Sequence, residues 1–314
     1  MAGSKVHHAP VREVILDLLW SAWTELGVPG TQRLHRRAVA DPEPLIVFAA
    51  ALSVEDPRLW EQVAAWCERY GDIVSKTRLD GLERRVPKAA ATAFGARVNE
   101  LGGAAADWGE GRRYRRIPTK GAKAPPLERP ALARLRMRAL AGTGTRSDVL
   151  CELVGDPHAW TSATDLERLG YARRSVARVL ADLATARLTV EKPGKGPASF
   201  RLRDAQALAK LIGAEDLNWP DWTSFLVLAW RLLELEAEQP SSSLLAQVKA
   251  RDAWDELRRI SVAAGLGEPP LLASEPADWQ RLLDWGLVAL RQWPSDAARA
   301  AIVPLSTRAA ASKP

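Results

Sequence analysis

The chain has 314 residues, of which 47% are hydrophobic and 26% are charged, a composition that is ordinary for globular proteins and argues against intrinsic disorder. This length is enough for two or three domains with a substantial core. No apolar run approaches the ~18 residues that a membrane-spanning helix requires. The N-terminus has no apolar stretch of the secretory type, so we expect a cytoplasmic protein without a membrane partner.

The formal net charge of +6 is unevenly distributed along the chain. Residues 10–110 contain 12 basic and 15 acidic residues, residues 111–204 contain 20 and 9, and residues 205–294 contain 8 and 13. The basic excess is therefore confined to the central segment. Such a local excess is expected where a protein neutralises nucleic-acid phosphates and releases their counterions.

Residues 10–110 have helical periodicity throughout and no strand-like alternation. The predicted helices span residues 10–26, 45–52, 56–74, 79–85 and 89–101. The second of these, LIVFAAAL, is apolar on all sides, which predicts a helix buried among others. These patterns predict an all-helical N-terminal domain.

Residues 111–130 are rich in basic residues, glycine and proline and are interpreted as a linker. The sequence leaves two readings open, a solvated linker or a basic arm that lies along DNA phosphates or enters a minor groove. In the second reading the phosphate contacts include Arg112, Arg113, Arg115 and Arg116.

The segment from Ala131 to Arg203 predicts four helices and a β-hairpin. The helices are expected at residues 131–140, 145–154, from Thr161 or Ser162 to 169, and 173–186. Two β-prone runs, LTVEK and ASFRL, follow at residues 188–192 and 198–202, separated by a turn with two prolines. The last helix leaves Arg173, Arg174 and Arg178 on or near its outer face, where they are candidates for reading DNA bases. The candidate phosphate contacts are Ser175, Lys192, Lys195, Arg201 and Arg203.

This order of elements resembles the winged helix-turn-helix proteins of the bacterial MarR and ArsR type. The residues that carry the resemblance are Gly170, Tyr171, Ser175, Val176, Leu180 and Leu183, and it covers about residues 131–203, under a quarter of the chain. It implies double-stranded DNA as a partner, with the helix at 173–186 in the major groove and the hairpin, or wing, on the backbone. Some winged helices bind only protein, and a structural module with solvated arginines is the alternative.

Residues 205–294 are again predicted to be helical, at 219–238, 244–264 and 276–293, and they hold seven of the 13 tryptophans. A tryptophan-rich helical face is typical of a core or of a dimer interface. Because a helix-turn-helix that reads a palindrome needs two copies, we expect a homodimer through these helices. Residues 295–314 are expected to form a flexible tail.

No catalytic constellation is apparent in the sequence. The histidines lack metal-ligand spacing, and Cys67 and Cys151 lie in predicted amphipathic helices as buried thiols. We therefore expect a mostly α-helical protein with a central winged helix between two all-helical domains, no enzymatic activity, no metal and no cofactor. The leading hypothesis is a bacterial transcriptional regulator. The alternative is a non-enzymatic subunit or scaffold of a defence, toxin–antitoxin or chromosome-maintenance complex, in which the winged helix contacts a protein partner.

Overall fold

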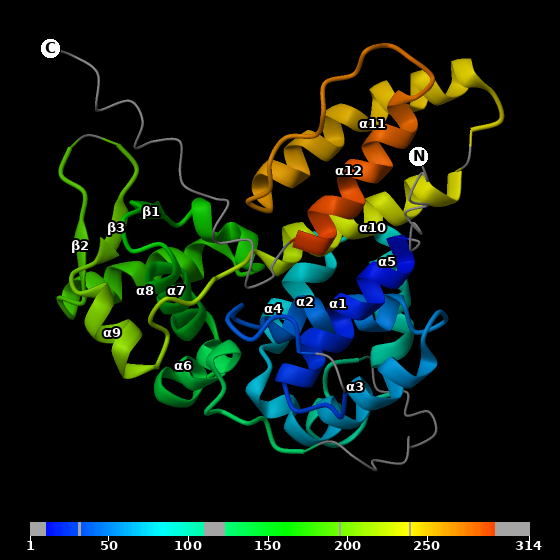
Figure 1. Ribbon diagram of the computed structural model, residues 1–314. Coiled ribbons are helices and arrows are strands. Elements are labelled where there is room, and N and C mark those ends of the chain that lie inside the picture. Colours follow the sequence, from blue (N-terminus) through cyan, green and yellow to red (C-terminus); the bar gives the residue numbers. More distant parts are fainter. Residues whose placement is uncertain (1–10, 31–32, 110–122, 195, 239, 293–314) are drawn as a thin grey trace, which may run out of the picture.

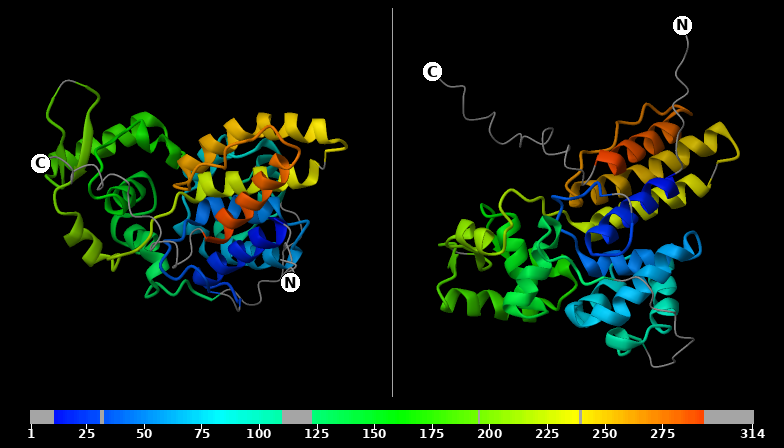
Figure 2. Two further views of the ribbon diagram at one scale, coloured as in Figure 1. Left: turned by 45° about the horizontal axis from the view of Figure 1, so that its top comes forward. Right: turned by 60° about the horizontal axis from the view of Figure 1, so that its bottom comes forward.

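The computed structural model describes residues 11–30, 33–109, 123–194, 196–238 and 240–292 (Figure 1). The chain is mostly helical, with a small three-stranded antiparallel sheet. Figures 1 and 2 show two lobes. The helical lobe combines the first five helices with the last three, and the mixed lobe holds the intervening helices and the sheet. Within the described ranges, no helix is both long and apolar enough to cross a membrane.

The helical lobe is built around one fully buried helix. Its α-helices are α1 (Val11–Glu25), α2 (Pro42–Ala51), α3 (Pro57–Tyr70), α4 (Lys76–Glu83), α5 (Lys88–Val98), α10 (Trp222–Glu238), α11 (Ser243–Ala263) and α12 (Asp278–Gln292), with the 3₁₀ turns η1 (Gly71–Ile73) and η2 (Gly103–Ala105). Every residue of α2 from Pro42 to Ala50 is buried. This confirms the buried helix that its apolar sequence predicts, although the helix begins earlier, with prolines in its first turn.

The two ends of the chain share one hydrophobic core. Buried residues of α1, α2 and α3 form a single cluster with those of α10, α11 and α12. The ring of Phe48 on α2 lies 6.1 Å from that of Trp230 on α10, and the Glu236 carboxylate on α10 accepts a hydrogen bond of 2.9 Å from the backbone N–H of Val11. The apolar side chains of residues 10–110 and 205–294 thus pack together in one core. The division of these segments into two separate helical domains stays a prediction.

The tryptophans of the C-terminal helices pack in this core or at its edge. Trp222 and Trp279 are buried, and Trp230, Trp254 and Trp285 pack against the cluster from its edge. The indole N–H of Trp222 donates to the carbonyl of Val39 at 2.8 Å. A homodimer through these helices stays a prediction.

The mixed lobe contains the predicted recognition elements. It consists of the 3₁₀ turn η3 (Pro130–Leu132), α6 (Ala133–Ala141), α7 (Thr145–Gly155), β1 (Thr161–Ser162), the 3₁₀ helix η4 (Asp165–Leu169), α8 (Arg173–Thr185), β2 (Thr189–Glu191), β3 (Ser199–Leu202) and α9 (Ala205–Leu211). The strand order is β1-β3-β2. Thr189 pairs with Leu202 and Thr161 with Phe200, both antiparallel. The hairpin of β2 and β3 projects from this lobe (Figure 1).

Two local predictions differ from the structure. The helix expected to begin at Thr161 or Ser162 is instead a two-residue strand followed by a 3₁₀ helix of five residues. Ser162 and Asp165 nevertheless interact reciprocally. The backbone N–H and the hydroxyl of Ser162 donate to the Asp165 carboxylate, at 2.8 and 2.7 Å, and Ser162 Oγ accepts from the backbone N–H of Asp165 at 3.3 Å. The short helix α9 follows the hairpin without having been predicted.

Candidate nucleic-acid interface

Helix α8 presents one buried and one exposed face. Val176, Leu180 and Leu183 are buried against the mixed-lobe core, which fixes the rotation of the helix about its axis. The exposed stripe consists of Arg174, Ala177, Arg178, Ala181, Asp182 and Thr185. It therefore offers two guanidinium groups separated by one turn, followed by small side chains and one carboxylate. Small residues let a helix backbone approach a groove closely, and alanine suits contact with a thymine methyl group.

The turn before α8 is seated against the helical lobe. Gly170 has a φ of +90°, in the left-handed region that favours glycine, and its backbone packs directly on Gly81 of α4. The next residue, Tyr171, is buried, and its hydroxyl donates to the Asp148 carboxylate at 2.7 Å and lies 2.9 Å from Ser75 Oγ. Burial, followed in effect by the Asp148 charge, raises the pKa of Tyr171, so it remains a neutral donor.

A buried network of charges lies behind this turn and links the two lobes. Arg78 pairs with Asp41 at 2.5 Å and with Glu43 at 2.9 Å, and its Nε donates to the carbonyl of Leu169 in η4. Arg138 of α6 pairs with Glu43 at 2.7 Å and with Asp148 at 2.9 Å.

Each acid of this network faces more than one guanidinium. Arg134 completes it, 3.0 Å from Asp148 and 3.0 Å from Glu152. Burial alone would raise the pKa of Asp148, but Arg138, Arg78 and Arg134 together hold it well below its usual range. All members of the network except Glu152 are almost completely buried, so Arg134 and Arg138 are excluded from any nucleic-acid contact despite their place in the basic segment.

Strand β3 of the hairpin alternates buried and exposed side chains, as its sequence predicts. Phe200 and Leu202 are buried, whereas Arg201, Arg203 and Lys192 are exposed. The guanidinium of Arg201 lies 4.6 Å from the ring centroid of Trp160, which precedes β1. This stacking restricts the side chain at the base of the hairpin. The contact between Arg201 and Trp160 was not predicted from the sequence. The only sequence feature that pointed to it was an aromatic residue, Trp160, close to an arginine-bearing sheet in the fold.

The predicted base-reading and phosphate residues occupy two adjoining elements. Arg173, Arg174, Ser175 and Arg178 are all exposed in the first two turns of α8, and the hairpin that follows directly carries the other three described candidates. Arg173 lies 3.8 Å from Glu167 in an exposed ion pair, and the Nε of Arg203 donates to the carbonyl of Arg187 at 3.1 Å. Lys195, Arg112, Arg113, Arg115 and Arg116 lie outside the described residues.

The described end of the predicted linker is packed rather than extended into solvent. The Arg129 guanidinium donates to the carbonyls of Thr24 and Glu25, at 2.5 and 3.2 Å. Residues 123–126 lie against Gly27 at the end of α1. This part of the segment therefore belongs to the surface of the helical lobe.

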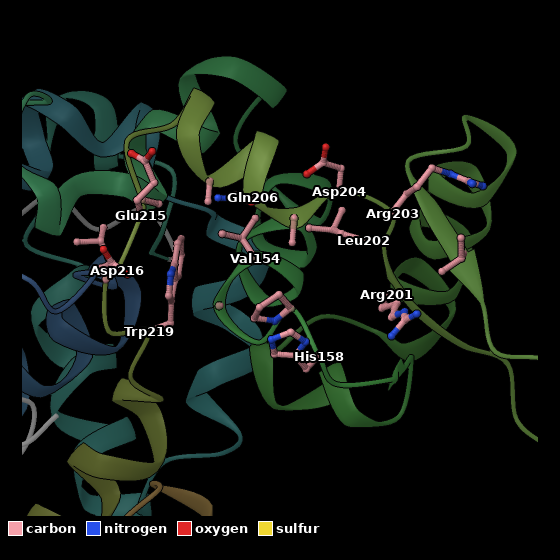
Figure 3. Close-up of a pocket in the computed structure, with 17 residues that line it drawn as sticks. Val154, His158, Arg201, Leu202, Arg203, Asp204, Gln206, Glu215, Asp216 and Trp219 are labelled. Atoms are coloured by element: carbon pink, nitrogen blue, oxygen red, sulfur yellow. The ribbon is translucent and has the colours of Figure 1, made fainter. Parts of the chain in front are cut away.

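Acidic residues around the interface limit its positive charge. Asp182 on α8 pairs with Arg146 at 3.3 Å, and Glu191 and Asp204 flank the hairpin strands. A groove of about 840 Å³ lies between β3, α9 and the 214–219 segment. Figure 3 shows Glu215, Asp216 and Trp219 at one side of it and Arg201 and Arg203 at the other. This mixed lining does not select one sign of charge in a ligand.

The chemistry of the remaining reactive groups is limited. Cys67 and Cys151 are buried free thiols, as predicted, and burial raises the pKa of Cys151 to about 12, which suppresses thiolate formation. Among the described residues, no three His, Cys, Asp or Glu side chains are arranged to hold a metal ion.

Comparison of the chain with protein-family models, with curated proteins and with solved structures finds no match. The resemblance to MarR- and ArsR-type winged helices therefore stays a prediction.

Proposed function

We propose that this chain binds double-stranded DNA through a winged helix-turn-helix formed by α7, η4, α8 and the β2–β3 hairpin. In this proposal α8 enters the major groove and the hairpin lies along the phosphate backbone. The observation that carries it is the exposed stripe of α8, where Arg174 and Arg178 stand beside Ala177 and Ala181. The exposed Asp182, one turn after Arg178, pairs with Arg146 at 3.3 Å. The proposal is supported by the chain order, in which the β2–β3 hairpin follows α8 directly.

The two groups of basic residues have different roles. Arginine in the first turns of a recognition helix can form two hydrogen bonds to guanine O6 and N7, and Arg173, Arg174 and Arg178 have that position. Ser175, Lys192, Arg201 and Arg203 serve as phosphate contacts, together with Lys195 and the basic residues 112–116. The stacking of Arg201 on Trp160 supports this role, because a restrained guanidinium loses less entropy on binding.

The biological role that fits this chemistry best is bacterial transcriptional regulation by a homodimer. A single winged helix contacts one half-site, and two copies related by a twofold axis contact a palindrome. No catalytic step is part of this proposal.

The direct test is capture of genomic fragments, including the region upstream of the protein's own gene, by the full chain at near-physiological salt, followed by sequencing. The expected result is enrichment of a small set of fragments that share a palindromic motif. A double variant, Arg174→Ala with Arg178→Ala, serves as the control and should lose this enrichment. Equal recovery of all fragments by both proteins would contradict sequence-specific binding, and recovery of no fragments would contradict DNA binding itself.

A further inference from the structure

A second basic site lies at the junction of the two lobes, away from the stripe of α8. It is a cavity of about 240 Å³ lined by Arg85, Arg168, Thr223, Ser224, Val227, Arg259, Ile260 and Ala263. Arg168 belongs to η4 of the mixed lobe, and the other residues belong to the helical lobe. The lining thus contains three guanidinium groups, two hydroxyl groups and no carboxylate.

Among the described residues, two of the three arginines have no neutralising partner. Arg168 pairs with Glu152 at 2.5 Å, whereas neither Arg85 nor Arg259 forms an ion pair there. Arg259 makes a single exposed contact, from its Nε to the carbonyl of Asp255 at 3.3 Å. Residues brought together from α11, η4 and the end of α4 therefore leave an excess of positive charge around one cavity.

The hydroxyl groups differ in their availability. The Asp221 carboxylate accepts hydrogen bonds from the backbone N–H and the hydroxyl of Ser224, at 3.1 and 2.9 Å, so the start of α10 is already capped. Thr223 is mostly buried, and its hydroxyl forms no hydrogen bond within the described part of the chain. It remains a donor for a ligand. An anion would then be held by guanidinium groups and one hydroxyl, and not by the capped start of the helix.

The remaining wall of the cavity is apolar, formed by Val227, Ile260 and Ala263. Guanidinium groups match phosphate oxygens in geometry as well as in charge, and a phosphate monoester carries close to two negative charges at neutral pH. The cavity exceeds the size of a phosphate group alone, so the apolar wall can contact an organic substituent.

We propose that this cavity is a binding site for a small phosphorylated molecule with an apolar or aromatic portion. Its phosphate contacts Arg85, Arg259 and Thr223, and its organic portion lies against Val227 and Ile260. Arg168 of η4, from the other lobe, lines the same cavity, so the bound ligand lies at the junction of the two lobes. The proposal does not depend on DNA binding by α8.

The test uses phenyl phosphate and inorganic phosphate as probes, titrated into the full chain by calorimetry at constant ionic strength. Phenyl phosphate should bind one molecule per chain, more tightly than inorganic phosphate. Arg85→Gln and Arg259→Gln should each weaken its binding at least about tenfold, as expected for loss of a charge-assisted hydrogen bond. Arg84→Gln is the matched control, because Arg84 is exposed beside Arg85 but does not line the cavity.

Three results would overturn the proposal. The first is no detectable binding of phenyl phosphate, and the second is an equal loss in Arg84→Gln, which would indicate unspecific attraction. In the third, Arg259→Gln lowers affinity for duplex DNA while leaving phenyl phosphate binding unchanged. The arginines would then contact the phosphates of DNA and not those of a small molecule. Circular dichroism of each variant confirms that losses do not reflect unfolding.

Discussion

Arg174 and Arg178 lie one helical turn apart on the exposed face of α8, whereas Lys192 lies on the hairpin. A bidentate arginine–guanine contact provides about 1–3 kcal/mol of discrimination between bases, but a phosphate contact provides affinity without sequence information. Replacing the two kinds of residue should therefore affect DNA binding differently: the arginines determine sequence preference, and the lysine determines overall affinity.

We predict that Arg178→Ala reduces the preference for a specific duplex over a scrambled one by about 1–3 kcal/mol and largely spares affinity for the scrambled duplex. Lys192→Ala should weaken binding to both duplexes alike and reduce the slope of log K against log salt by about one. Fluorescence anisotropy at two salt concentrations measures both effects. Arg58→Ala, an exposed change on α3, is the control. An equal loss of affinity or of base preference in this variant would contradict the roles assigned to Arg178 and Lys192.

The buried acids predict how stability depends on pH. Burial alone would raise the pKa of Asp41 and of Asp148, but the neighbouring guanidinium groups lower both below their usual values. Their stabilising contribution is complete above the unfolded-state pKa of about 3.9, and it is lost as pH falls through the lower folded-state values. The free energy of unfolding in urea should therefore decrease steadily below about pH 4. A ¹³C titration in which the Asp148 carboxylate protonates near its ordinary pKa would contradict this account.

At the scale of elements, the contact between α4 and the turn before α8 depends on two glycines. A Cβ atom at Gly81 would lie 1.7 Å from the carbonyl oxygen of Gly170, so the two backbones would have to separate. We predict that Gly81→Ala destabilises the protein by about 1–3 kcal/mol, the usual cost of overpacking, and lowers DNA affinity by displacing α8.

The matched control is Gly95→Ala in α5, where the nearest atom to an added Cβ is Glu83 Oε1 at 3.8 Å. Alanine there should raise helix stability by up to about 1 kcal/mol. Thermal unfolding of both variants tests the contrast, and equal effects would show that the close approach of the two backbones is not a constraint.

Periodicity predicted most α-helices because amphipathic spacing reports burial directly. The spacing of Val176, Leu180 and Leu183 predicted a helix at residues 173–186, whose end differs by one residue from that of α8. The all-apolar sequence of α2 predicted that this helix is buried. The strand β1 was missed because two residues have no detectable period, and its partner β3 is distant in the sequence.

The packing between distant segments could not be read from sequence patterns. Arg134 and Arg138 count as positive charges in the sequence, yet Asp41, Glu43 and Asp148 neutralise them. Nothing in a single sequence indicates which of the many arginines has a buried partner. The same limit applies to the exposed candidates Arg174 and Arg178, whose position on α8 was predictable and whose role in binding stays a prediction.

At the scale of the molecule, the buried network and the glycine contact attach the mixed lobe to the helical lobe. Each charged group of the network has an oppositely charged partner, and removing one charge from it would leave another buried and uncompensated. The mixed lobe, which carries α8, is therefore fixed in one orientation relative to the helical lobe and is not joined to it only by flexible linkers. In a dimer, this arrangement would fix the spacing between the two copies of α8.

A protein that reads a palindrome should form a homodimer whose two recognition helices are about 34–36 Å apart. We predict that light scattering detects a dimer in solution, or on addition of a duplex with two half-sites. A monomer at all accessible concentrations, with only one copy bound per duplex, would instead favour the alternative in which the chain is a subunit of a larger complex.

The most direct test of the central claim is the salt dependence of binding to duplex DNA by the full chain. With at least three phosphate contacts from Lys192, Arg201 and Arg203, log K should fall linearly with log salt at a slope of about −3 or steeper. A variant with all three changed to alanine should reduce the magnitude of this slope by about three while remaining folded. Affinity that is independent of salt, or a slope that the triple variant leaves unchanged, would contradict DNA binding by this surface.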